Sequence, residues 1–192
     1  MGLVIEKLLR NTPLNDVERE VCLRGIAQVA MADGVQDARE RAYLEKFVDE
    51  FFPDADPTDT AWNTPLTPAD LARLGSDEVK MAFLGYGYIT AYVDEEFVAQ
   101  EAELLEEWAK VLVSDEARNE VITAVREFLY RRSVFAYAFR LARLDEEFAV
   151  AAAQRFDVSM ERAREINANV FNAIMTLRNP VASAEMEATE TG

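Results

Sequence analysis

Two pairs of carboxylate residues stand at the same spacing in two similar stretches of the sequence. In the first stretch Glu40 follows Asp33 by seven residues, and in the second Glu101 follows Asp94 by seven. Carboxylate oxygens are the ligands that hard cations such as Ca²⁺, Mg²⁺ and Mn²⁺ prefer. If the four groups converge, they would form an oxygen-only site for one divalent cation.

The two carboxylate pairs belong to a longer internal repeat. Residues 21–44 align without a gap on residues 82–105, and the alignment superimposes the two Asp and the two Glu positions. A third, weaker copy begins at residue 134, where Asp145 takes the Asp position. The residue seven beyond it is Ala152, so this copy has no paired Glu.

Apolar residues recur at helical spacing along nearly the whole chain, and no stretch shows sustained alternation. The sequence therefore predicts an all-α protein, a helical bundle of two pseudo-repeated helix hairpins with a C-terminal helical extension. We expect helices over residues 3–10, 16–32, 37–51, a short segment from Pro68, 76–113 with a break near Asp94, 114–143, 145–156 and 158–178.

The predicted helices point the four carboxylates inward. Asp33 continues the apolar stripe that ends at Val29, and Glu40 leads the stripe that continues at Leu44. An inward carboxylate needs hydrogen-bond donors, a counter-charge or a metal. The competing interpretation is structural, with Asp33 and Glu40 accepting backbone N–H bonds at the ends of facing helices. Asp37 and Glu95 lie beside these positions and are candidate additional metal ligands.

Composition limits the chemistry and the partners. The chain of 192 residues has 36 Asp and Glu against 20 Lys and Arg, a net charge of −16 and no histidine. The lack of histidine excludes Ser-His-Asp and Cys-His catalysis and His-ligated zinc or haem. The negative charge argues against nucleic acid as a partner. Cys22 is the single cysteine, and we expect it to be an inert core residue in a cytoplasmic protein.

The string AMADGVQDARE, residues 30–40, resembles the tellurite-resistance TerB-like family of small all-helical proteins. The resemblance covers roughly residues 17–130 and carries over Asp33, Gly34 and Glu40, and through the repeat Asp94 and Glu101. It implies an acidic patch, divalent-metal binding, and a role in stress response or as an interaction module. One departure is that Glu95 replaces the glycine in the second unit.

The predicted domain organisation has three parts. Residues 1–132 form the TerB-like helical domain, residues 133–179 a helical extension packed on it, and residues 180–192 a disordered tail. Glu103, Glu106 and Glu107 lie off the apolar stripe of their helix and are candidates for an interaction surface, with a solvated face as the alternative. Arg131 and Arg132 are the basic candidates, with pairing to the acidic face of another helix as the alternative.

The sequence favours a binding function over catalysis, because no nucleophile and no phosphate cradle accompany the carboxylates. We expect a non-enzymatic cytoplasmic protein that binds a divalent cation through Asp33, Glu40, Asp94 and Glu101. The alternative is an adaptor for other proteins in which the carboxylates are purely structural. We expect other proteins as partners, no nucleic acid and no integral membrane segment, and the oligomeric state stays open.

Overall fold

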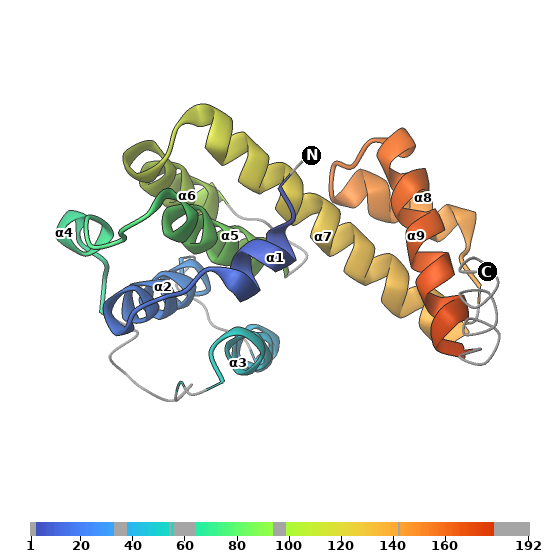
Figure 1. The fold of residues 1–192 in the computed structure, drawn as a ribbon, viewed down its shortest axis with the longest axis horizontal. Coiled ribbons are helices and arrows are strands. Elements are labelled where there is room, and N and C mark those ends of the chain that lie inside the picture. Colours follow the sequence, from blue (N-terminus) through green and yellow to red (C-terminus); the bar gives the residue numbers. More distant parts are fainter. Residues whose placement is uncertain are drawn as a thin grey trace, which may run out of the picture. The chain divides into compact units, whose positions relative to one another are not determined.

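The computed structural model describes residues 3–32, 38–53, 55, 64–93, 99–141 and 143–178, without the side chains of residues 38–44, 93 and 178. Every regular element in these ranges is an α-helix (Figure 1), which confirms the predicted all-α class. The helices are α1 (Ile5–Asn11), α2 (Asp16–Val29), α3 (Ala38–Phe51), α4 (Pro68–Leu71), α5 (Asp77–Val93), α6 (Ala99–Leu112), α7 (Asp115–Leu141), α8 (Glu146–Arg155) and α9 (Met160–Arg178).

Local capping explains where several helices begin and end. Asn15 and Glu18 form a reciprocal capping box at the start of α2, and Thr67 and Asp70 form another at the start of α4. Helix α2 ends at Val29, before the predicted residue 32, because the amides of Met31 and Ala32 bond only three residues back and tighten the chain into a turn.

The chain divides into two compact units, residues 1–125 and residues 126–192, and the division falls within α7. The predicted extension starts at residue 133, a little beyond this division. The predicted tail, residues 180–192, lies outside the described residues, as does the turn that contains Gly34. The pseudo-repeat of two hairpins stays a prediction, because the turns that define both hairpins are not described.

Helix α5 is the centre of the first unit. It packs against α1, α2 and α6 (Figure 1), and all of its residues from 82 to 91 are buried. A helix that is apolar on every side needs neighbours all round. Gly85 lets α1 approach, since a Cβ there would lie 2.8 Å from Cδ1 of Ile5.

Two further glycines set how closely α2 and α6 approach α5. A Cβ on Gly25 of α2 would lie 2.5 Å from Cε2 of Phe83, and one on Gly87 of α5 would lie 2.6 Å from Cδ2 of Leu105. Real Cβ atoms do not come this close to other carbon atoms, so a larger residue at either position would require the facing side chain, Phe83 or Leu105, to shift.

An aromatic cluster joins α1 and α3 to α5. The ring of Tyr86 lies 5.9 Å from that of Phe47, 5.7 Å from that of Phe51 and 5.0 Å from that of Phe52. The Tyr86 hydroxyl donates to the carbonyl oxygen of Leu9 at 2.9 Å, which satisfies the polar end of a buried side chain. This one residue therefore holds two helices onto α5.

Cys22 lies fully buried in α2. Burial raises the pKa of its thiol, and the nearby charge of Glu18 adds to the effect. The thiol is therefore protonated at neutral pH, as expected of a core residue.

The second unit packs α8 and α9 against the last part of α7. The rings of Tyr137 and Phe148 stack at 3.9 Å, joining α7 to α8. The Tyr130 hydroxyl lies 2.8 Å from Oδ1 of Asn167, which joins α7 to α9. Within the described ranges, no helix is both long enough and apolar enough to cross a bilayer.

The approach of α2 to α5 predicts that Gly25→Ala destabilises the protein. Alanine gains about 1 kcal/mol of helix propensity over glycine. Overlap with the Phe83 ring costs more, and we expect the free energy of unfolding to fall by about 1–2 kcal/mol in urea denaturation. Phe83→Leu removes the overlapping ring atoms, so the double variant should be less destabilised than the sum of the single variants. A Gly25→Ala variant more stable than the wild type would contradict the tight crossing.

Candidate carboxylate site

Three helix ends meet at one end of the first unit. Gly25 of α2 faces Phe83 of α5, and Val29 faces Gly87 one turn further along both helices. The two contacts advance together, so α2 and α5 run in the same direction. Helix α6 runs the opposite way, since Phe83 meets Trp108 with ring centroids 5.2 Å apart, and Gly87 meets Leu105. The last turns of α2 and α5 therefore lie beside the first turn of α6.

Glu101 occupies this place in the first turn of α6. It lies four residues before Leu105, so it is one helical turn closer to the end where α5 finishes. Its side chain is 5% exposed, and Thr90 of α5 is buried as well, with its hydroxyl donating to the carbonyl oxygen of Tyr86. Glu101 therefore points into the helix bundle, as the sequence predicted.

The other predicted ligands lie outside what the structure describes. Glu40 belongs to α3, but its side chain is not described. The remaining four stand in the two connections that follow α2 and α5: Asp33, Asp37, Asp94 and Glu95. Within the ranges that are described, no group of three or more Asp, Glu or Cys side chains comes close enough to hold a metal ion. Glu101 is thus the one proposed ligand whose place is given.

Among the side chains of the first unit that the structure describes, two other charged ones are buried, and both have structural roles. The Glu18 carboxylate accepts from the backbone N–H of Asn15 at 3.0 Å and from that of Gly75 at 3.1 Å. It thereby ties the start of α2 to the segment before α5. Such bonds offset the cost of burying the charge.

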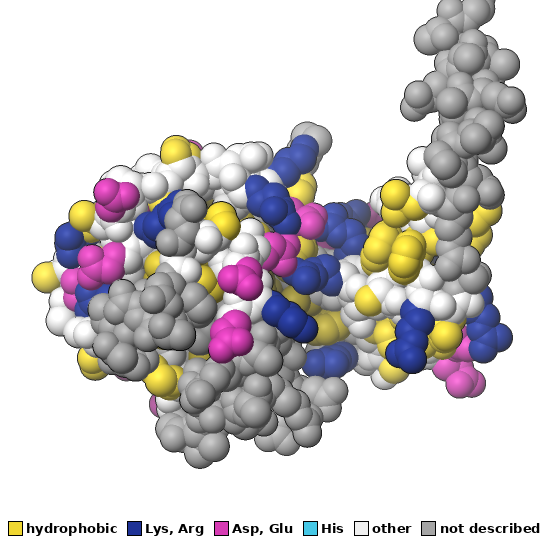
Figure 2. Space-filling view, turned by 90° about the horizontal axis from the view of Figure 1, so that it is seen from below, with side chains coloured by type: hydrophobic (Ala, Val, Ile, Leu, Met, Phe, Trp, Pro, Cys, Tyr) yellow, Lys and Arg dark blue, Asp and Glu magenta, His cyan; other side chains and the backbone are white. Residues whose placement is uncertain are grey.

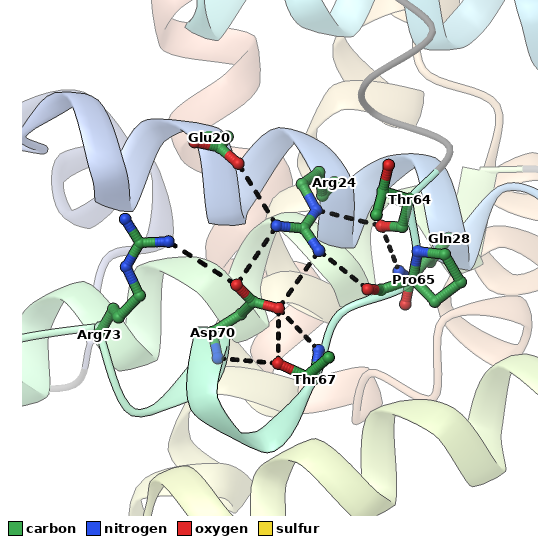
Figure 3. Close-up of polar contacts among 8 residues, drawn as sticks. All are labelled: Glu20, Arg24, Gln28, Thr64, Pro65, Thr67, Asp70 and Arg73. Atoms are coloured by element: carbon green, nitrogen blue, oxygen red, sulfur yellow. Dashed lines mark hydrogen bonds and ion pairs between the residues drawn. The ribbon is translucent and has the colours of Figure 1, made fainter.

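Arg24 of α2 is the second buried charge and fixes the segment that leads into α4 (Figure 3). Its guanidinium donates to the carbonyl oxygens of Thr64 at 3.0 Å and Pro65 at 2.8 Å. It also spans both carboxylate oxygens of Asp70, at 3.3 and 3.2 Å, and reaches Glu20 at 3.3 Å. The planar guanidinium suits this bidentate pairing.

Asp70 is held ionised by this arrangement. The backbone N–H and the hydroxyl of Thr67 donate to its carboxylate, and Arg24 adds a further hydrogen bond and its charge. Together these lower the pKa of Asp70 to about 2, with the Thr67 backbone bond as the largest cause. The group acts as a cap and an anchor rather than as an acid or base near neutral pH.

The acidic side chains of α6 predicted as an interaction surface differ in their surroundings. Glu103 and Glu107 are exposed. Glu106 instead accepts from Arg118 at 2.7 and 2.8 Å and lies 3.6 Å from Nζ of Lys110. Glu106 is therefore engaged within its own unit.

The two predicted basic members of that surface lie on α7. The guanidinium carbons of Arg131 and Arg132 are 5.9 and 5.4 Å from the ring centroid of Phe128. Cation–π contact of this kind holds each guanidinium against the protein while leaving its charge in place. Arg132 is exposed and Arg131 is half-buried.

Sequence reasoning missed the structural role of Arg24 and Asp70. The capping role of Asp70 could have been predicted, because Thr67 followed three residues later by Asp70 has the spacing of a capping box. The pairing of Arg24 with Asp70 could not, since the two residues are 46 positions apart in the sequence and no local pattern connects them.

Comparison with known proteins adds no assignment. No family model matches the chain, and neither the curated proteins nor the solved structures give a match. The resemblance to the TerB-like family therefore rests on the sequence motif alone.

The lowered pKa of Asp70 predicts a loss of stability in acid. A carboxyl whose folded pKa is about 2 and whose unfolded pKa is near 4 stabilises the fold above pH 4. That contribution, on the order of 2 kcal/mol, is lost as the pH falls from about 4 to about 2. In Asp70→Asn, urea denaturation at pH 6 should show a free energy of unfolding that is already lower by this amount. Between pH 4 and pH 2 the free energy of unfolding should then fall less steeply in the variant than in the wild type. Asp77→Asn, at an exposed carboxyl, is the matched control. Equal slopes in wild type and Asp70→Asn between pH 4 and 2 would refute the assignment.

Proposed function

We propose that the chain is a non-enzymatic TerB-like protein of the cytoplasm that binds a divalent cation. Asp33, Glu40, Asp94 and Glu101 are its ligands, and Asp37 and Glu95 are adjacent candidates. The protein acts in stress tolerance, of which tellurite resistance is the form that the family resemblance suggests. The first shell is oxygen only, which favours Ca²⁺, Mg²⁺ or Mn²⁺.

The observation that carries this proposal is the buried carboxylate of Glu101 at the end of the unit where α2 and α5 finish. Asp33 comes one residue after the described turn at the end of α2, and Asp94 comes one residue after the end of α5. The chain thus enters both acidic connections from the same end of the helix bundle. This is the placement that a shared site requires.

Electrostatics gives the reason why a cation would be held. Several carboxylates gathered in a poorly solvated place repel one another, and each carries a desolvation cost. A divalent cation replaces that repulsion with attraction, so its binding free energy appears as folding free energy.

Thermal unfolding in the presence of cations tests the proposal. At a free cation concentration of about 100 times the Kd, binding adds roughly 3 kcal/mol, or about 5–10 °C in Tm for a chain of this size. We expect the wild type to show such a rise with CaCl₂, MgCl₂ or MnCl₂ after treatment with EDTA. The rise should vanish in the Asp33→Asn, Asp94→Asn double variant and in Glu101→Gln.

The matched control is Glu103→Gln, which removes an exposed carboxylate from the same helix, two residues away. It should keep the full response to the cation. Absence of a shift with all three cations, or an undiminished shift in Glu101→Gln, would rule out the site.

A second candidate function, an adaptor for other proteins, is supported by the uneven distribution of charge. Residues 1–125 contain 26 acidic and 11 basic side chains, whereas residues 126–192 contain 10 acidic and 9 basic ones. The first unit therefore has a net charge of −15 and the second a net charge of −1. In this alternative the buried carboxylates are structural, and the exposed acids of α6 attract a basic partner.

Reversing the exposed charges of α6 tests the adaptor. Glu103→Lys with Glu107→Lys should abolish capture of a protein that the wild type captures, and should weaken association mainly through the on-rate at low salt. Glu45→Lys with Glu78→Lys changes exposed charge equally elsewhere in the first unit and is the control. Capture that survives the α6 reversal would contradict the α6 surface.

A further inference from the structure

A small cavity opens to solvent on the first unit. It has a volume of about 400 Å³ and lies between the end of α3 and the connection from α1 to α2. Three of its lining side chains are charged, one from each of these helices: Arg10, Arg19 and Glu50. Its volume falls within the range of small-molecule sites, which is roughly 300–1,000 Å³.

The two guanidiniums of the lining lie near the same hydroxyl group, that of Tyr86. Burial raises the pKa of Tyr86, and the charges of Arg19 and Arg10 oppose that rise, so both act on this one hydroxyl. Tyr86 lines the cavity as well. A carboxylate bound in the cavity can therefore face two positive charges at once.

Arg10 is held in place but keeps donors for a ligand. Its Nη2 atom donates to Oε1 of Glu50 at 2.7 Å, and its guanidinium carbon lies 5.3 Å from the centre of the Phe51 ring. A guanidinium carries several N–H donors, and the bond to Glu50 uses only one of its nitrogen atoms. The ring and the carboxylate together orient the guanidinium before a ligand arrives, which lowers the cost of binding.

Glu50 brings the opposite charge to the cavity. It lies in the last turn of α3, and its carboxylate can accept from more than one donor, so the bond from Arg10 does not prevent a second. Helices α1 and α3 both end beside the cavity, and the C-terminal end of a helix carries a partial negative charge. This part of the wall therefore stabilises an ammonium group.

The charges in and around the cavity favour a zwitterion as the ligand. A simple cation would face the guanidiniums of Arg10 and Arg19. A simple anion would face Glu50 and the net charge of −15 that the first unit carries. Figure 2 shows acidic side chains scattered over one face of this unit. A molecule with one carboxylate and one ammonium carries no net charge and meets an opposite charge at each end.

The rest of the lining is largely apolar and suits a hydrocarbon side chain on the ligand. Pro13 and Leu14 come from the connection between α1 and α2, and Phe52 comes directly after the end of α3. A few charged groups that converge beside an apolar wall are typical of small-molecule sites, because the charges fix the orientation while the wall adds buried area.

We propose that this cavity binds a free α-amino acid with an apolar side chain. Arg10 and Arg19 hold its carboxylate, and Glu50 holds its ammonium group. Its side chain lies against Leu14 and Phe52. The site shares no residue with the proposed cation ligands, so the two functions are independent. Binding ties the end of α3 to the connection between α1 and α2 and so stabilises the first unit.

Isothermal titration calorimetry of the full chain in EDTA tests the site with three probes. L-leucine has both charged groups, N-acetyl-L-leucine lacks the ammonium, and L-leucinamide lacks the carboxylate. We expect L-leucine to bind with a Kd on the order of 0.1 mM, as suits a ligand of this size with a charged contact at each end. The other two probes should each bind at least about tenfold more weakly, because each lacks one of the two charged contacts.

Variants of the lining assign the two contacts. Arg10→Gln and, separately, Glu50→Gln should weaken the binding of L-leucine by at least about tenfold. Both side chains are partly exposed, so circular dichroism should show wild-type helix content in each variant. Asp49→Asn removes an exposed carboxylate that stands next to Glu50 in α3 but does not line the cavity. It is the matched control and should bind L-leucine as the wild type does.

The outcomes decide the proposal. Absence of binding by L-leucine at up to about a hundred times the expected Kd would overturn it. Equally tight binding of N-acetyl-L-leucine would make the cavity a plain anion site and overturn the assignment of an amino acid. Undiminished binding in Arg10→Gln and Glu50→Gln would place the ligand elsewhere on the chain and overturn the site. Because EDTA is present throughout, failure of the cation proposal would leave these results unaffected.

Discussion

The burial of α5 on all sides is the constraint on which the first unit depends. Its residues from 82 to 91 have no exposed face, so α1, α2 and α6 must all reach it closely. Glycines at three crossings make that possible, each where a Cβ would come within 2.8 Å of a neighbouring side chain. Once these crossings are fixed, the positions of α2 and α6 along and around α5 are fixed too, because close-packed helices allow few arrangements. As a consequence, the last turns of α2 and α5 lie beside the first turn of α6.

Buried charge in this unit divides into two kinds. Glu18 and Arg24 form hydrogen bonds with backbone groups in the connection between α3 and α5. Glu18 accepts from the N–H of Gly75, and Arg24 donates to the carbonyl oxygens of Thr64 and Pro65. Glu101 lies instead where the chain twice leaves a helix and enters an acidic connection. The first kind of burial orders the chain. The second kind is the basis of the proposed cation function, because Asp33 and Asp94 follow the two helices that finish at this end.

The sequence predicted what depends on periodicity and on local chemistry. Each expected helix has a counterpart, and Pro68 after Thr67 correctly placed the start of α4. Helix ends were predicted less well, as at α2, where the last expected turn is tighter than an α-helix. Contacts across long separations were out of reach: Arg24 with Asp70, and Tyr86 with Leu9. The inward direction of Glu101 was predictable from local spacing alone. Glu101 follows Asp94 by seven residues and precedes the apolar residue Leu105 by four, which is about one helical turn. The convergence of the four carboxylates depends on tertiary packing of two connections, which no local spacing determines.

The position of Cys22 makes the protein suited to kinetic measurement. Its thiol is the single one in the chain, and it is fully buried in α2, the helix that packs most extensively on α5. A thiol reagent can modify it only when α2 separates from α5. The rate at which the thiol is modified under native conditions therefore measures how often the first unit opens, independently of the second unit. A cysteine introduced at a buried position of the second unit, such as Ala163, would report the opening of that unit in the same way.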